Sequence, residues 1–196
     1  MERIQPFDLV IFLALLAMFV VGYAQGVIRR LLGIAAMTFA LILGAQMREP
    51  LGQYLANQWT TIAPDYSYMV AFGAVFVAAA VTLSIAIQIT YRPAPLFHRY
   101  PVLDEIVGGL LGVVEGFLIL IVIMLILDPY FTQDAFRERA GLGEFGLLRS
   151  LHGWLDPTLT ADVLRHNVIP VILAIIGILI PLDVRNAFAQ ALTARR

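Results

Sequence analysis

The chain has 196 residues, of which 60% are hydrophobic and only 14% are charged. These values exclude a disordered chain and argue against a water-soluble domain. The net charge of −1 gives no reason to expect a nucleic-acid partner, and the absence of cysteine excludes disulfides, zinc–thiolate sites and a cysteine nucleophile.

Four long apolar runs predict transmembrane helices. The runs cover residues 9–28, 31–47, 66–91 and 106–127. Only the last run contains a charge, which is Glu115. A hydrocarbon core about 30 Å thick needs roughly 20 helical residues, and lipid forces the backbone to satisfy its own hydrogen bonds. We therefore predict an all-α integral membrane protein built on a bundle of four transmembrane helices, over residues 1–128.

Charged residues and prolines are expected to lie at the joints between these helices. Arg29 and Arg30 separate the first two runs and should lie at the membrane interface. Proline lacks an amide donor and disfavours helix at the residue before it. The segments 48–50 and 92–95 should therefore end the second and third helices, and Asp128-Pro129 should end the fourth.

Residues 129–196 form a separate C-terminal region in this interpretation. We expect short helices around residues 136–140 and 147–155, and a turn at Asp156-Pro157. The apolar segment 168–182 could cross the membrane if its helix begins near Asp162, with Arg165 extending to the interface; it could equally be a re-entrant or interfacial helix. Residues 183–196 predict an amphipathic helix on the membrane surface, with an apolar face formed by Val184, Phe188, Ala191 and Leu192.

The arginines near the helix ends predict the orientation in the membrane. The first and third loops hold Arg29, Arg30, Arg92 and Arg99, whereas the N-terminus and second loop hold Arg3 and Arg48. This bias favours an outside N-terminus and cytoplasmic first and third loops. A signal peptide cleaved near residue 24 is the alternative for the first run, but the run leads into a second helix, so we expect an uncleaved anchor. All 13 basic residues are arginine. Phosphate recognition at lipids would explain this, although biased genomic composition is the explanation we favour.

Glycines and two carboxylates lie on one face of the fourth helix. Gly108, Gly112 and Gly116 are spaced four residues apart, and Asp104 and Glu115 fall close to the same face. Glycine lets helix axes approach closely in lipid, so we expect packing at this strip, preferably against the first helix with its Gly22 and Gly26.

These elements together are similar to a known family. The first half reads Asp8, a helix, Gly22-x-x-x-Gly26-Val27-Ile28-Arg29-Arg30, and the second reads Leu103-Asp104-x-x-x-Gly108-x-x-x-Gly112-x-x-x-Gly116. In this order and spacing, they resemble the colicin V production protein (CvpA) family of bacterial inner-membrane proteins, over roughly residues 5–155. The resemblance implies four helices, a variable C-terminal region, and a link to toxin export and envelope function without an assigned biochemical activity.

The acidic residues have both structural and functional explanations. Glu115 lies near mid-membrane, where a carboxylate must be neutral, paired or hydrated. It either joins helices, which we favour, or marks a proton or cation path, and its candidate partners are Arg29, Arg30, Gln25, Gln46 and Gln88. Asp104 and Asp8 are expected to stabilise helix N-termini, with an interfacial ion pair as the alternative.

No pattern in the sequence indicates a catalytic site, a cofactor or a metal. His152 lies close to Ser150, but no nucleophile motif surrounds them, and His98, His152 and His166 are scattered. We expect a non-enzymatic inner-membrane protein in contact with the lipid bilayer, acting as a homo-oligomer or with other envelope or secretion proteins. The alternative is a small oligomeric transporter or channel that uses Glu115 as its proton or cation site.

Overall fold

The computed structural model describes residues 5–59, 64–91, 96, 101–131 and 146–193. Its four longest helices are α1 (Pro6–Gln25), α2 (Val27–Gln58), α3 (Pro64–Thr90) and α4 (Pro101–Phe131). The C-terminal part contains α6 (Gly146–Leu155), α7 (Leu159–Val163), the π-helix η1 (Leu164–Val168), α8 (Ile169–Ile176) and α9 (Leu182–Thr193). The described residues contain no strand, which confirms the prediction of an all-α protein.

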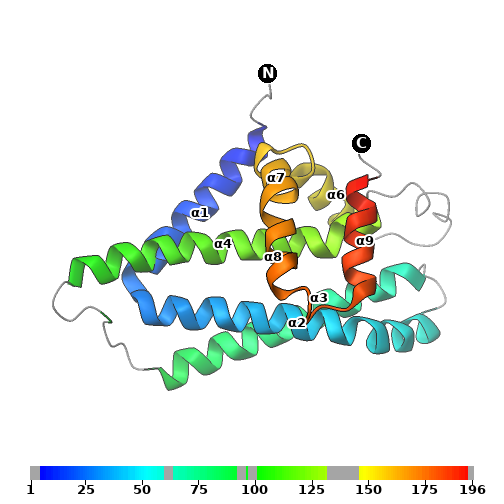
Figure 1. The fold of residues 1–196 in the computed structure, drawn as a ribbon, viewed down its shortest axis with the longest axis horizontal. Coiled ribbons are helices and arrows are strands. Elements are labelled where there is room, and N and C mark those ends of the chain that lie inside the picture. Colours follow the sequence, from blue (N-terminus) through cyan, green and yellow to red (C-terminus); the bar gives the residue numbers. More distant parts are fainter. Residues whose placement is uncertain (1–4, 60–63, 92–95, 97–100, 132–145, 194–196) are drawn as a thin grey trace.

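Five helical stretches are long and apolar enough to cross a membrane. These are α1 to α4 and the continuous stretch Leu159–Ile176, which combines α7, η1 and α8. The protein is therefore a multi-pass membrane protein. In Figure 1, α2, α3 and α4 run roughly parallel, α1 leans obliquely against α4, and the α7–α8 stretch passes across α4 instead of following it.

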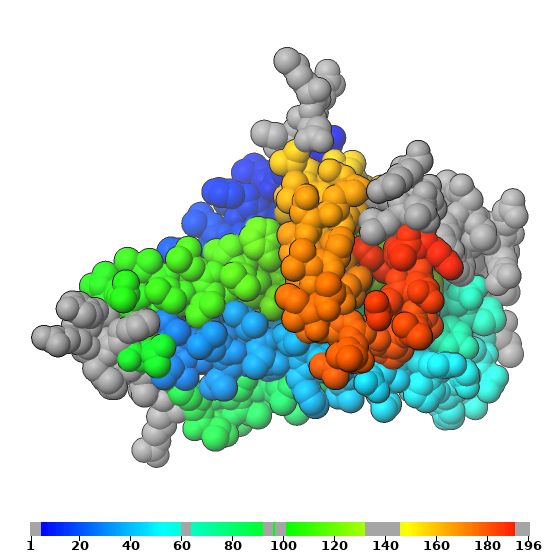
Figure 2. Space-filling view, in the orientation of Figure 1, coloured from blue at the N-terminus to red at the C-terminus, as the bar shows by residue number. Residues whose placement is uncertain are grey.

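The core lies where the C-terminal helices cover this bundle. Buried side chains from α2, α3 and α4, such as Leu41, Phe72 and Met124, join Ile169 of α8 and Phe188 of α9 in one cluster. The space-filling view shows α8 and α9 lying over α2 and α4 on this face (Figure 2). The C-terminal region is therefore packed onto the four long helices.

Three expected helix ends are wrong. The first break lies at Gly26, with a φ of 76°, and not at Arg29-Arg30. The second helix continues through Pro50 to Gln58, and the fourth continues through Pro129 to Phe131. One missing amide costs a helix a single hydrogen bond, and packing against neighbouring helices compensates for it. Close to Pro50 in α2, Gly52 packs against Tyr68 of α3. In α4, Pro129 itself is buried.

The C-terminal predictions have mixed outcomes. The helix at 147–155 and the turn at Asp156-Pro157 are confirmed, whereas residues 136–140 lie outside the described residues. The placement of α9 on the membrane surface is wrong for its apolar face. Val184 and Phe188 are buried in the protein core, so this face packs against other helices and not against lipid.

The π-helix η1 has a local cause at its C-terminal end. Pro170 lacks an amide that could donate to residue 166, and its ring crowds the preceding turn of an α-helix. The chain widens before it, and the amide of Ile169 donates to the carbonyl of Leu164, five residues back. Such wide turns are often found at functional sites, and this one contains the buried Arg165.

Candidate functional site

The predicted glycines meet at the interface between α1 and α4. A Cβ at Gly108 would lie 2.7 Å from the carbonyl oxygen of Gly22, and one at Gly116 would lie 2.8 Å from Leu15 Cδ2. At Gly112, it would collide with the backbone carbonyl of Met18. The two backbones therefore approach so closely that no side chain fits between them.

Asp104 connects the turn at Gly26 to the start of α4. Its Oδ2 accepts a hydrogen bond from the amide of Val27 at 3.4 Å, and its Oδ1 accepts one from the amide of Leu96 at 2.9 Å. Val27 is the first residue of α2, so the carboxylate stabilises the free amides of a second helix as well as lying in the first turn of its own. The positive φ of Gly26 provides the sharp reversal that brings Val27 to it.

Glu115 forms an ion pair with Arg30. Nη1 of Arg30 donates to Oε2 of Glu115, and the two side chains are only 6% and 9% exposed. Gly33, one turn along α2, leaves room for the carboxylate, because a Cβ there would lie 2.8 Å from Oε1. Of the five partners considered from sequence, the structure selects Arg30, whose side chain is buried between the helices.

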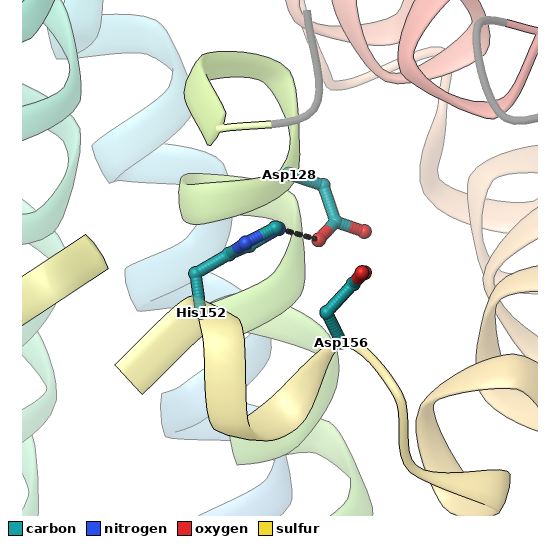
Figure 3. Close-up of side chains that lie close together, drawn as sticks. All are labelled: Asp128, His152 and Asp156. Carbon is teal, nitrogen blue, oxygen red and sulfur yellow. Dashed lines mark hydrogen bonds and ion pairs between the residues drawn. The ribbon is translucent and has the colours of Figure 1, made fainter. Parts of the chain in front are cut away.

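A second buried group of charges lies at the other end of α4, and Figure 3 shows its acidic and histidine members. Asp128 accepts from Nε of Arg165 at 2.7 Å and from Nη2 at 2.9 Å. Nε2 of His152, on α6, lies 3.2 Å from Oδ1 of Asp128. Asp156 completes the group, since its Oδ1 lies 3.1 Å from Nη2 of Arg165. We call these four residues the Asp128 cluster.

Three members of the Asp128 cluster have the composition of a metal site. Ligand atoms of Asp128, His152 and Asp156 lie within 4.8 Å of one another. However, the guanidinium of Arg165 contacts both carboxylates, and its positive charge takes the place that a cation would need. The geometry fits a salt-bridge network better than a metal centre.

Asp8 connects the two ends of the chain. Its carboxylate accepts from the amide of Gln5 at 3.0 Å, at the start of α1. It also accepts from the amide of Thr160 at 3.2 Å and its hydroxyl at 3.0 Å, at the start of α7. One side chain therefore stabilises the N-termini of two helices.

Arg48 connects three helices in a similar way. Its guanidinium donates to the hydroxyl of Tyr130 on α4 at 3.0 and 3.1 Å, and it pairs with Asp183 on α9. It also lies 5.6 Å from the ring centroid of Tyr68 on α3. From the sequence, Arg48 is expected only at the end of a helix and in the second loop.

The Asp128 cluster was missed for a similar reason. From the sequence, Asp128 is expected at a helix end, His152 in a short helix and Arg165 at the interface, so each has a local explanation. The expected extension of Arg165 to the interface is wrong, because its side chain is only 3% exposed. The usable signal was that a charged residue within an apolar segment needs a partner of opposite sign.

Comparison with models of known protein families gives a match. The model of the family described as Colicin V production protein matches residues 7–139, which is more than half of the chain. No curated protein and no solved structure matches.

Proposed function

Because this chain belongs to the colicin V production protein family, we propose that it is a non-enzymatic accessory protein of the bacterial inner membrane. Its contribution would be to toxin production or export and to maintenance of the envelope. The family match supports the proposed contribution to toxin production, since the family is named for the production of colicin V. Its working environment is the lipid bilayer, where it acts as a homo-oligomer or with other secretion or envelope proteins.

The observation that carries the accessory role is the pairing of Glu115 with Arg30. Glu115 is the one charge in the apolar run of α4, and Arg30 already neutralises it. A carboxylate with a guanidinium partner is a poor cation site, because a second cation must compete with a fixed charge. The pair joins α2 to α4, which supports a structural role.

The host organism provides the direct test. Deletion of the gene should lower the export of a colicin V-type toxin and increase sensitivity to detergents, and the wild-type gene should restore both. A Glu115→Gln variant should restore toxin export and detergent resistance in proportion to the amount of folded protein, which immunoblotting of membranes measures. Normal export and normal envelope resistance in the deletion strain would contradict the proposal.

A transporter is the second candidate, and a polar cavity beside Glu115 supports it. The cavity has a volume of about 240 Å³. Proton and ion flux should be measured in liposomes that contain the wild type, Glu115→Gln or the exposed-site control Arg149→Gln. Flux that Glu115→Gln alone abolishes would favour transport. Absence of flux in all three, with lower stability only for Glu115→Gln, would favour the accessory role.

We also propose an outside N-terminus with cytoplasmic first and third loops. The arginine bias supports this orientation. The chain has no native cysteine, so single cysteines can report it without background. Leu96→Cys, between α3 and α4, should react only after the membrane is opened, whereas Tyr54→Cys, near the end of α2, should react in intact cells. Both positions are exposed.

A further inference from the structure

The cavity beside the Arg30–Glu115 pair is lined by an unusual set of polar groups for a membrane helix bundle. Its polar lining comes from four helices and consists of Gln25, Arg29, Arg30, Ser84, Gln88 and Glu115. Such groups are costly in lipid unless they are paired or functional. A polar pocket of this size therefore needs an explanation that helix packing does not supply.

Most of the hydrogen-bond donors around the cavity are unused. Arg30 is 95% buried, and its Nε has no hydrogen-bond partner, because the pair with Glu115 is made through Nη1. Among the described residues, the side chains of Arg29, Gln25 and Gln88 also make no hydrogen bond. Arg29 and Gln25 are half-buried and Gln88 is exposed, so the cost of a buried donor without an acceptor, about 1–3 kcal/mol and more for a charged group, applies to the Nε of Arg30. The lining is therefore complementary to a ligand rich in acceptors.

The charge of the lining indicates the sign of that ligand. Arg29 and Arg30 contribute two positive charges, and Glu115 contributes one negative charge, so the lining carries a net charge of +1. Glu115 is occupied by Arg30, which leaves Arg29 without an ion-pair partner among the described residues. A single anionic group would balance the cavity.

The position of the cavity indicates its depth in the membrane. Gln25 is the last residue of α1, Arg29 and Arg30 lie in the first turn of α2, and Gln88 lies close to the end of α3. In Figure 1, the α1–α2 turn, the end of α3 and the start of α4 gather at the same end of the bundle. The donors of the cavity therefore lie close to the boundary between hydrocarbon and water, where lipid phosphates lie, whereas Glu115 lies in the middle of α4.

We propose that this cavity is a binding site for a phosphate group, recognised by Arg29 and the free Nε of Arg30, with the amides of Gln25 and Gln88 as further donors. Guanidinium groups match phosphate in both charge and geometry. The interfacial depth favours the phosphate of an anionic phospholipid. A soluble phosphate has the same recognition chemistry, and the test separates the two sources.

The test measures ligand binding to the purified full chain in a neutral detergent. Phosphatidylglycerol, phosphatidylcholine and inorganic phosphate are added separately, and binding is followed by native mass spectrometry and by the shift in melting temperature. The wild type should bind phosphatidylglycerol at least tenfold more tightly than phosphatidylcholine, because only the former balances the positive charge. Inorganic phosphate that stabilises the wild type, without a preference for phosphatidylglycerol, would instead identify a soluble source.

Two variants locate the binding, and a third controls for loss of charge. Arg29→Gln should weaken binding about tenfold, and Gln88→Leu should weaken it severalfold without a change in charge. Both should fold, because neither side chain makes a hydrogen bond or ion pair within the part of the chain that the structure describes. Arg149→Gln removes an exposed arginine on α6, which does not line the cavity, and should bind as the wild type does. Equal binding by Arg29→Gln and the wild type, or an equal loss in Arg149→Gln, would overturn the proposal.

Discussion

Replacement of Asp128 by asparagine should destabilise the protein strongly. Asparagine keeps the shape and one acceptor of the side chain, so the substitution removes mainly its charge. Asp128 is 1% exposed, and it accepts two hydrogen bonds from Arg165 at 2.7 and 2.9 Å. Removing one partner of a buried pair typically costs 3–5 kcal/mol, because the other charge stays buried and uncompensated.

The expected loss for Asp128→Asn is at the lower end of this range. Arg165 keeps two contacts with Asp156, one at 3.1 Å to Oδ1 and one at 3.2 Å to the backbone oxygen. The side chain of Asp156 is 40% exposed, so water weakens its attraction to the guanidinium. We therefore expect a decrease of about 3 kcal/mol in the free energy of unfolding.

The assay is equilibrium unfolding in mixed micelles, followed by tryptophan fluorescence. Trp154 lies on α6, two residues from His152, and reports on this region. Asp183→Asn is the matched control, because Asp183 also pairs with an arginine but its side chain is 46% exposed. Exposed pairs contribute about 0–1 kcal/mol. The double variant Asp128→Leu/Arg165→Met should lose less than the sum of the two single variants. Equal small losses in Asp128→Asn and Asp183→Asn would refute the reasoning.

Three further predictions follow from close contacts. Gly112→Ala should lower the free energy of unfolding by at least 1–3 kcal/mol, because the new Cβ would meet the carbonyl of Met18. Gly73→Ala should be neutral or stabilising, because nothing lies within 4 Å of its Cβ position. The melting temperatures of the two variants test this difference. Asp8→Ala should cost about 1–2 kcal/mol and increase hydrogen exchange in α7; unchanged exchange would contradict the cap. Added Zn²⁺ should not raise the melting temperature of the wild type, because the guanidinium of Arg165 already occupies the Asp128 cluster. If Zn²⁺ stabilised the wild type but not His152→Ala, the cluster would instead be a metal site.

The features that the sequence predicted best depend on local spacing. An uncharged run of 20 residues can only be a helix in lipid, and glycines four residues apart share a face wherever the helix lies. The position of Asp104 in the first turn of its helix follows from the same kind of local rule. Such features can be predicted because the period of an α-helix follows from its own local hydrogen bonds.

The features that could not be predicted depend on how helices are rotated and shifted against each other. Glu115 had five candidate partners, and the choice of Arg30 required the facing surfaces of α2 and α4 to be known. Asp128 and Arg165 are 37 residues apart and lie on elements that cross, so no spacing rule relates them. Pro50 failed as a helix end because tertiary packing outweighs a local preference when an element is held on several sides.

The distribution of the polar contacts explains how a few of them can specify the arrangement of the helices in an apolar chain. Lipid is as apolar as leucine, so it provides little drive for one helix face over another, and association depends on close packing and polar contacts. Among the described residues, four of the polar groups each join a different set of elements. The Arg30–Glu115 pair joins α2 to α4, the contacts of Arg48 join α2 to α4 and α9, the Asp128 cluster joins α4 to α6 and η1, and Asp8 joins α1 to α7. A slip or rotation of any one of these helices would break at least one of these contacts. Specification of one arrangement, more than a gain in stability, is therefore the role that these contacts share.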